Sequence, residues 1–595
     1  MTRMYHCHAF RNAIPRLRSY HTCKPSLNAS STYVCALGIA GAGAAAYGLQ
    51  VWKCCRAPEN EVVDFIVVGA GSAGCAVAAR LHQGLPDAKV LLLEAGEDDD
   101  VPEIQTAVDY FGKVDRVFTS DRDWGHGTES ETGLGGRGLY WPRGKVVGGC
   151  SSFNTMVWMR PEKEDLDRWA NVMQDASWGY AGMLPFFKRA ETHPLSKEKP
   201  DVHGSSGPIA VARLDHKQHN HAAHETTHTF VNAAAYLGVP KNSDFGASLA
   251  GVGINDVNAA EGRRCSASAY LRMVDACPGS GERCATAVGL EVRLLTQTMK
   301  VLFDNNKCAT GVEVCEDARE DGQSRRKIYA RREVVLCGGA VNTPQLLMLS
   351  GVGPADHLQD LKIPVVADVP GVGQNLQDHL HVAMSYRLPG GLKPHPQSNI
   401  CEGSLFTRLA SGIGPSDLQV HMGTVFFEPD GFYPSGEGFT LTPTLIHSKA
   451  SGTLRLRSVD PFEKPEIVAN YLSDPADLLQ LRRGLQFVRE IGKEMLNRLG
   501  SGEEVYPGKS VQSDIEVDDY IRKYANTVYH PACTCRAGSP LDATSVLDSE
   551  MRVRKVKQLR VADASAMPTH VGCNTNATCV ALGERLADIL VKAYR

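Results

Sequence analysis

Three glycines at positions 69, 71 and 74 follow a Gly-x-Gly-x-x-Gly pattern, and each has a mechanical use. Gly69 permits a tight turn, Gly71 lets the backbone approach a pyrophosphate, and Gly74 lets a following helix pack closely on a sheet. The amides at the start of such a helix attract anionic phosphates. Glu94, about 20 residues further on, is placed to accept hydrogen bonds from a ribose. The pattern predicts a dinucleotide site.

The residues on either side of the glycines predict the strands and the helix that must position this site. The apolar run 62–68 predicts a buried strand, the segment AVAARLHQGL predicts a helix, and KVLLLEAG predicts a second strand that ends near Glu94. This order is one βαβ unit of a parallel sheet. By itself it leaves open whether the dinucleotide is FAD or NAD.

Later segments add strands of two kinds. Runs at 291–303, 309–315 and 327–337 predict further strands, and a helix is expected from about Pro344. The segments FTLTPTLIHS and GTLRLRS alternate apolar and polar residues, which predicts antiparallel strands of a second sheet. We therefore expect an α/β fold in which a parallel nucleotide-binding sheet is interleaved with an antiparallel, substrate-facing sheet.

Histidines and cysteines occur in groups that could suggest a metal. The histidines of the passage HKQHNHAAHETTHTF are His216, His219, His221, His224 and His228. They lack the HExxH order, and a solvated surface segment explains them. The 18 cysteines are scattered without paired CxxC units, and Cys533 and Cys535 form only a CxC. We predict reduced thiols and no metal site.

Length and charge narrow the class of protein further. At 595 residues the chain exceeds the usual size of one domain, so two packed domains are expected. Lys and Arg total 63 against 67 Asp and Glu, a formal charge of -4. This balance does not favour nucleic acid as a partner.

The N-terminus differs from the rest of the chain. No Asp or Glu precedes Glu59, while several Arg and Lys do, and an acid-free, Arg-bearing leader is typical of a mitochondrial targeting segment, here 1–32. A disordered arm is the alternative. Residues 33–52 carry no charge over the ~20 residues that cross a bilayer as a helix. Because the run is mostly Ala and Gly, 33–58 is either a transmembrane anchor or a linker.

Three further segments resemble the signatures of the glucose-methanol-choline (GMC) oxidoreductase family. They are PRGKVVGGCSSFNTM at 142–156, GGAVNTPQLLMLSGVG at 338–353, and VADASAMP at 561–568 followed by GCNTNA at 572–577. GVGQNLQDH at 371–379 and NYLSDP at 470–475 also match. The resemblance runs from about Val62 to the C-terminus. It implies an N-terminal, FAD-binding part at 62–375 and a C-terminal part at 445–590 that carries the substrate sheet and the catalytic residues.

The resemblance implies FAD as the cofactor, held by a Rossmann-like domain interleaved with an α+β substrate domain built on an antiparallel sheet. In the family the isoalloxazine lies against the first of these segments, and hydride passes to flavin N5. Besides the glycines and Glu94, the implied FAD contacts are Val146, Gly148, Gly149, Asn154, Thr155, Asp563 and Asn576. Some members attach the flavin through a His at the position of Phe153. Because Phe has no nucleophile, we predict noncovalent FAD.

The resemblance also implies a catalytic pair for alcohol oxidation. His530 aligns with the family's catalytic His, and an imidazole with a pKa near ~6.5 suits the removal of a hydroxyl proton. Asn574 aligns with the second site position, where an amide can hydrogen-bond the developing alkoxide. His570 has no assigned role, and we expect it to serve in packing.

The electron acceptor and the alcohol stay open. The leader favours a membrane-associated mitochondrial dehydrogenase that passes electrons to a quinone or a carrier protein. A soluble oxidase that uses oxygen is the alternative. Choline would need aromatic faces and a carboxylate, to which Trp124, Trp158 and Glu402 could contribute.

Two other functions are disfavoured. Cys401 lies near the position of a functional Cys in the photodecarboxylases of the family, but the Arg expected further along is missing, and Val420 and His421 occupy that region. A flavoprotein without catalysis is disfavoured because His530 and Asn574 are both present.

Overall fold

The computed structural model describes residues 61–106, 117–214, 223–277, 284–316, 324–392, 399–410, 414–428 and 435–595. The predicted targeting segment 1–32, the uncharged run within 33–58, and the histidines at 216, 219 and 221 lie outside these residues. Among the residues described, none of the helices has both the length and the apolar character needed to cross a bilayer.

The first sheet is mixed and has the order β12-β13-β2-β1-β16-β15-β14, with β28 paired to β16. Its strands are β1 (Glu61–Val68), β2 (Val90–Leu93), β12 (Cys284–Ala287), β13 (Leu290–Arg293), β14 (Thr296–Phe303), β15 (Ala309–Glu316), β16 (Arg325–Leu336) and β28 (Leu559–Val561). The central strands β13, β2, β1, β16 and β28 pair in parallel, as the βαβ pattern predicts. β12, β14 and β15 add antiparallel edges.

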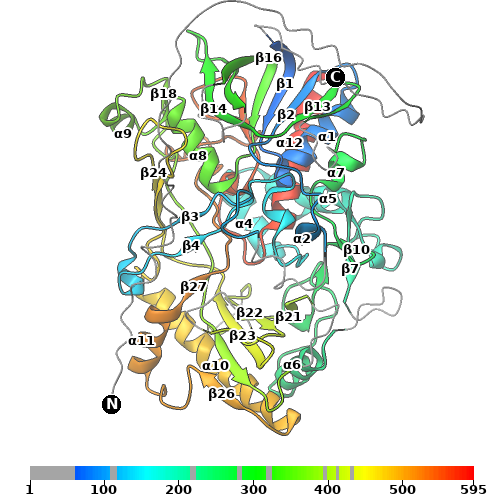
Figure 1. Ribbon diagram of the computed structural model, residues 1–595, viewed down its shortest axis with the longest axis vertical. Coiled ribbons are helices and arrows are strands. Elements are labelled where there is room, and N and C mark those ends of the chain that lie inside the picture. The colour runs from blue at the N-terminus through cyan, green and yellow to red at the C-terminus, as the bar shows by residue number, and fades with distance from the viewer. Residues whose placement is uncertain are drawn as a thin grey trace, which may run out of the picture. The chain divides into compact units, whose positions relative to one another are not determined.

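The second sheet is antiparallel and has the order β26-β20-β23-β22-β21-β8, with β19 bridging β23 and β27. Its strands are β8 (Gly251–Ile254), β19 (Leu380–His381), β20 (Met384–Arg387), β21 (Cys401–Thr407), β22 (Leu418–Gly423), β23 (Gly438–Leu445), β26 (Glu503–Tyr506) and β27 (Asn526–Thr527). Figure 1 shows the first sheet at the top and the second at the bottom.

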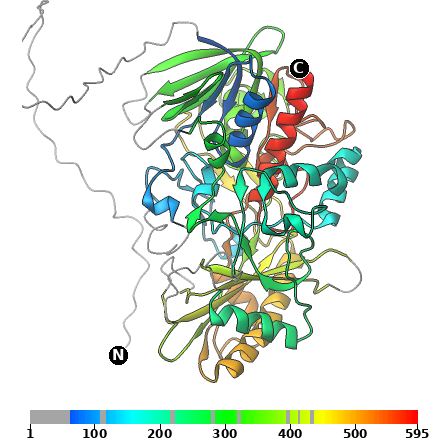
Figure 2. The same ribbon diagram turned by 90° about the vertical axis from the view of Figure 1, so that its right-hand side faces the viewer.

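The helices pack on these sheets, on one another or on the short elements between them. They are α1 (Ser72–Gly84), α2 (Pro102–Gln105), α4 (Lys163–Met173), α5 (Tyr180–Ala190), α6 (Glu225–Tyr236), α7 (Ala269–Arg272), α8 (Gly339–Leu349), α9 (Ala355–Asp360), α10 (Pro475–Leu499), α11 (Asp514–Tyr524) and α12 (Asn576–Tyr594). α1 and α12 lie side by side against the first sheet (Figures 1 and 2), and α6 and α10 pack on the second. A Cβ at Gly583 would lie 2.5 Å from the Ala73 carbonyl oxygen, so α12 approaches α1 closely.

Short elements connect the two sheets. Paired short strands are β3 (His126–Gly127) with β4 (Tyr140–Trp141), β5 (Glu191–Thr192) with β6 (Ile209–Ala210), β7 (Ala212–Arg213) with β9 (Asp256–Val257), β10 (Ala259–Ala260) with β11 (Arg263–Arg264), β17 (Val352–Gly353) with β18 (Ala367–Asp368), and β24 (Thr453–Arg455) with β25 (Glu466–Val468). The 3-10 turns are η1 (Thr132–Leu134), η2 (Gly149–Ser152), η3 (Ala176–Trp178), η4 (Pro194–Lys197) and η5 (Ala564–Ala566). The chain passes between the sheets repeatedly, since β8 precedes β12–β16 and β28 follows the second sheet. The predicted interleaving is confirmed.

Two predictions about elements were wrong. Helix α8 begins at Gly339, five residues before Pro344. Asp563 accepts a hydrogen bond from the Gly339 amide, and the Ala340 carbonyl, which Pro344 cannot bond, accepts one from the Thr534 hydroxyl instead. The segment GTLRLRS forms β24, which pairs with β25 and not with the second sheet.

Candidate active site

The start of α1 forms an open, positively polarised helix end. Gly71 is the N-cap, its φ is -80°, no side chain caps the helix, and no acidic residue lies in the first turn. The nearest atoms to a Cβ built on Gly71 are 4.0 Å away, whereas a Cβ on Gly74 would clash with the Gly69 carbonyl oxygen. Gly74 therefore serves close packing, while Gly71 leaves space in front of the helix amides, as a pyrophosphate requires.

The loop at 144–153 lies across this helix end. The Gly148 amide donates to the Ala70 carbonyl at 2.7 Å. Gly149 has a φ of +54°, and a Cβ there would lie 2.8 Å from Gly71 Cα. Val146, just before, is fully buried and pairs with Glu97. Glycine at 149 thus allows two backbone segments to meet beside the predicted cofactor.

Glu94 lies at the end of β2 and supports the same turn. Its carboxylate oxygens accept hydrogen bonds from the Ala70 amide at 2.8 Å and the Gly96 amide at 2.9 Å. Burial raises the pKa of Glu94 to about 7, against these two hydrogen bonds. A carboxylate has further lone pairs, so Glu94 can still accept from ribose hydroxyls.

Two predicted cofactor residues lie close to the helix end and the loop. Asn576 starts α12, and its Oδ1 accepts from the Ser72 hydroxyl at 2.8 Å, which places it beside the first turn of α1. Asn154 follows the loop, and its Oδ1 accepts from the Met156 amide and from Arg264. The next residue, Thr155, accepts through its carbonyl from the Asn399 amide group.

Asp563 is a fold-stabilising carboxylate in this structure. It is buried, and its oxygens accept hydrogen bonds from Gly339, Thr343 and Ser565. Burial raises its pKa despite these bonds. Asp563 therefore fixes α8 against η5, and its predicted contact with the cofactor stays a prediction. The helix end, the glycine contact and Glu94 together fit a dinucleotide.

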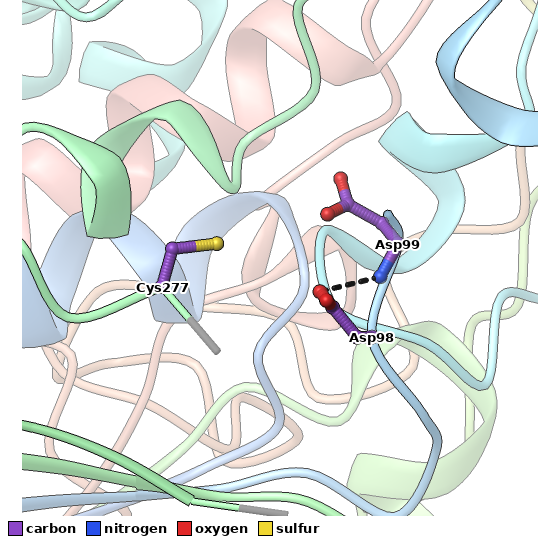
Figure 3. Close-up of side chains that lie close together, drawn as sticks. All are labelled: Asp98, Asp99 and Cys277. Atoms are coloured by element: carbon purple, nitrogen blue, oxygen red, sulfur yellow. Dashed lines mark hydrogen bonds between the residues drawn. The ribbon is translucent and has the colours of Figure 1, made fainter. Parts of the chain in front are cut away.

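A cluster of two carboxylates and a thiol lies near this region, and the two carboxylates, Asp98 and Asp99, belong to the chain that follows β2. Figure 3 shows Cys277 pointing toward Asp98 and Asp99, and the ligand atoms of the three lie within 4.8 Å of one another. The Asp99 carboxylate already accepts hydrogen bonds from the hydroxyls of Ser266 and Ser268 and from Arg272. Since Arg272 already supplies a positive charge that balances the Asp99 carboxylate, we assign this cluster a structural role.

The predicted base, His530, lies on a loop with unusual backbone geometry. Tyr529 and Cys533, on either side of it, have φ values of +67° and +70°. The segment 377–379 holds this loop: Asp378 accepts a hydrogen bond from the His530 amide at 2.9 Å, and Gln377 pairs with Ala532. Strained backbone of this kind persists only where the surroundings enforce it.

The His530 ring has a polar neighbour at each nitrogen. Its Nδ1 is 3.0 Å from Nδ1 of His379, and its Nε2 is 3.4 Å from Nδ2 of Asn574. His570 is 2.7 Å from the His530 carbonyl through Nε2, and its ring lies 3.9 Å from that of His379. The structure therefore brings the two predicted catalytic residues together and adds two further histidines.

The imidazoles of His530 and His379 are kept neutral. Burial lowers the pKa of His530 well below its usual range, and the electrostatic effects of His570, His421 and Arg143 act in the same direction. Burial also lowers the pKa of His379 well below its usual range. A neutral His530 is the form that can accept a proton.

One face of the second sheet forms a polar wall beside His530. Gln419 and His381 both pair with Thr444, so their side chains lie in one row, and His421 follows two residues after Gln419 on the same face. Burial lowers the pKa of His381 to about 4 and that of His421 to about 3. Nδ1 of His381 and Oε1 of Gln419 are buried without a hydrogen-bond partner in the described part of the chain. The wall is thus polar, uncharged and able to bond a ligand.

Cys401 lies on the neighbouring strand, with its Sγ 3.3 Å from Nδ1 of His421. Burial raises the pKa of Cys401 to about 12, so the pair is a neutral thiol beside a neutral imidazole. The residues considered for a quaternary ammonium have other partners. Trp158 donates to Glu191 at 2.7 Å, and the face of Trp124 is covered by Lys145. The Glu402 carboxylate accepts from the Thr227 hydroxyl and the His224 amide at the start of α6.

The contributions of His379, Asp378 and Gln419 were missed by the sequence reasoning. His379 and Asp378 lie in the GVGQNLQDH segment, so the resemblance marked them, but nothing in the sequence joins them to a loop about 150 residues later. Gln419 carries no motif. The alternation of Gln419 and His421 with apolar residues on one strand was the one signal available.

Sequence models of the GMC oxidoreductase family match residues 63–381 and 448–583. Choline dehydrogenase, mitochondrial, of Mus musculus is 37% identical over 583 residues, covering 92% of this chain and 94% of the mouse protein. Choline oxidase of Arthrobacter globiformis is 37% identical over 549 residues, covering 90% of this chain and 95% of the bacterial protein.

Solved structures give the same result for the fold. Pyridoxine 4-oxidase from Mesorbium loti superimposes with a TM-score of 0.78 at 29% identity, covering 88% of this chain and 98% of that chain. Formate oxidase superimposes with a TM-score of 0.77 at 24% identity, covering 90% and 99%. At that identity formate oxidase supports the fold alone.

Proposed function

Since the chain belongs to the GMC oxidoreductase family, and is thus an FAD-dependent alcohol oxidoreductase, we propose that His530 is the base that takes the hydroxyl proton of the substrate. The observation that carries this proposal is the position of His530 Nε2, which faces the Asn574 amide at 3.4 Å on the side of the polar wall. Alkoxide formation needs a neutral imidazole to accept the hydroxyl proton and, close beside it, an amide to hydrogen-bond the oxygen.

The chain's residues divide the work in the following way. As the carbon loses a hydride, its hydroxyl proton passes to Nε2 of His530 and the carbon becomes a carbonyl. Asn574 donates a hydrogen bond to the oxygen on which negative charge develops, and it does not compete for the proton. When bound, FAD supplies N5 as the acceptor of the hydride. The residues that would hold it are the α1 amides, the loop at Gly148 and Gly149, and Glu94.

We predict that acid precipitation of the purified enzyme releases its flavin into the supernatant. Phe153 occupies the position of the covalent attachment site, and its ring packs edge-on against Phe118 with centroids 5.7 Å apart. A hydrocarbon side chain in that contact has no nucleophile for the flavin. Absorbance of supernatant and pellet measures the outcome, and yellow colour that stays in the pellet would contradict it.

For the electron acceptor, we propose a quinone or a carrier protein. The mouse relative is named a mitochondrial dehydrogenase, and the acid-free leader of this chain favours the same compartment. The alternative is a soluble oxidase that uses oxygen, which the name of the Arthrobacter relative favours. The membrane anchor proposed for 33–52 lies outside the described residues.

The function is tested by bleaching the flavin absorbance anaerobically with a panel of alcohols and then admitting air. Choline is the first alcohol to test because two of the relatives act on it by name. We expect at least one alcohol to bleach the flavin and colour to return slowly in air, as for a dehydrogenase. Rapid return of colour would favour the oxidase. If no alcohol of the panel bleaches the flavin, the proposed role of His530 in alcohol oxidation is wrong.

A further inference from the structure

The His530 ring lies inside a row of hydrogen-bonding side chains that starts on the second sheet. Nε2 of Gln419 is 3.1 Å from Oδ1 of Asn574, Nδ2 of Asn574 is 3.4 Å from Nε2 of His530, and Nδ1 of His530 is 3.0 Å from Nδ1 of His379. Gln419 and His379 are buried at the two ends of the row. Side chains from four segments far apart in sequence therefore form one hydrogen-bonded row.

The direction of these bonds follows from the groups at the Gln419 end. Nε2 of Gln419 also lies 3.9 Å from the Met159 sulfur, an atom that can only accept. The amide nitrogen of Gln419 is thus the donor toward Oδ1 of Asn574. Asn574 then presents its NH₂ group to His530, so Nε2 of His530 must accept.

A neutral imidazole carries one N–H, so an accepting Nε2 places the proton of His530 on Nδ1. That N–H points at Nδ1 of His379, which must accept it and carry its own proton on Nε2. Burial lowers the pKa of His379 well below its usual range. His379 is thus a neutral acceptor. This tautomer of His530 is the one whose Nε2 can take a substrate proton.

We propose that His379 and Gln419 are positioning residues that hold His530 in its proton-accepting tautomer, His379 by accepting from Nδ1 and Gln419 by orienting Asn574. The proposal rests on the role of His530 as the base. Without the acceptor at His379, the Nδ1–H of His530 would be buried and unpaired, which disfavours this tautomer. The other tautomer carries its proton on Nε2 and cannot act as a base.

The test compares His379→Leu with His379→Asn in the FAD-loaded enzyme. The Asn carbonyl oxygen lies near the place of Nδ1 and can accept the same hydrogen bond, whereas Leu, of similar size, cannot. We expect His379→Leu to slow flavin reduction at saturating alcohol about 10- to 100-fold, as loss of an orienting partner does at other sites. The apparent alcohol dissociation constant and the FAD content should stay unchanged. His379→Asn should keep most of the wild-type rate.

A spectroscopic readout separates orientation from general damage. In enzyme labelled with ¹⁵N-histidine, the His530 signal, assigned by its loss in His530→Asn, should show an unprotonated Nε2 in the wild type and a protonated one in His379→Leu. Gln419→Met, which keeps the length and removes the N–H, should move rate and signal in the same direction. Gln419→Met also tests the positioning role if His379→Leu does not fold.

The outcomes distinguish failure of the positioning role of His379 and Gln419 from failure of His530 as the base. If His379→Leu is as fast as the wild type, or if His379→Asn is as slow as His379→Leu, the positioning role is wrong. An Nε2 that stays unprotonated in the slow variant would also overturn it. If the variants of His530 itself reduce the flavin normally, the proposed base is wrong, and the positioning role falls with it.

Discussion

Replacing His530 by Ala is expected to slow the reduction of bound flavin by a saturating alcohol at least ~100-fold, the lower end for loss of a general base. The reason is that His530 is the neutral imidazole whose Nε2 faces the Asn574 amide, where it can accept the hydroxyl proton. Stopped-flow absorbance under anaerobic conditions measures the rate. FAD should remain bound, because His530 is a residue of the catalytic loop and not of the cofactor cradle.

His530→Asn is the matched control for this variant. Asn fills more of the space than Ala and keeps hydrogen-bonding groups toward His379 and Asn574, but it cannot take a proton at neutral pH. Both variants should be comparably slow. If Asn restored the rate, His530 would serve in orientation, and if both variants were fast, another group would have to remove the proton.

The second large effect is expected at Gly71. Its φ of -80° suits Ala, and an added Cβ meets no protein atom nearer than 4.0 Å, so Gly71→Ala should fold normally. The methyl group would instead occupy the space in front of the α1 amides. Overpacking of this kind costs ~1–3 kcal/mol, which corresponds to a roughly 5- to 150-fold weaker affinity for FAD. Titration of the apoprotein with FAD measures it.

Gly74→Ala is the contrasting variant. Its methyl group would clash with the backbone of Gly69, so it should lower the unfolding temperature of the apoprotein as well as the flavin content. Gly71→Ala should lower the flavin content alone. Normal FAD affinity in Gly71→Ala would show that the pyrophosphate does not approach this helix end.

Local patterns in the sequence predict the fold well where one segment determines its own structure. The run 62–68, the glycines and Glu94 lie within one βαβ unit, and the structure has it as predicted. The start of α8 was missed because the carboxylate that accepts from its first amide is that of Asp563, more than 200 residues away. The pairing of β24 was missed because alternation predicts a strand but not its neighbour.

The same distinction applies to the candidate site. Resemblance marked His530 and Asn574, and these two side chains meet in the structure. The residues around them depend on long-range contacts that no local pattern contains, such as Asp378 holding the His530 amide and Gln419 facing Asn574. Their chemistry is ordinary for buried polar groups, so only their position gives them a role.

The way the chain alternates between its two sheets affects when the enzyme can first hold its cofactor. Strand β28 completes the first sheet, and α12, which starts at Asn576, packs on α1 beside the helix end formed by the first glycines. Both lie several hundred residues after the glycine turn in the chain. The glycine turn is therefore made early in synthesis, but its surroundings are complete only once residues 559–594 have been synthesised. We expect FAD to load only after that point, so a chain cut before β28 should yield a colourless protein even though every phosphate-binding glycine is present.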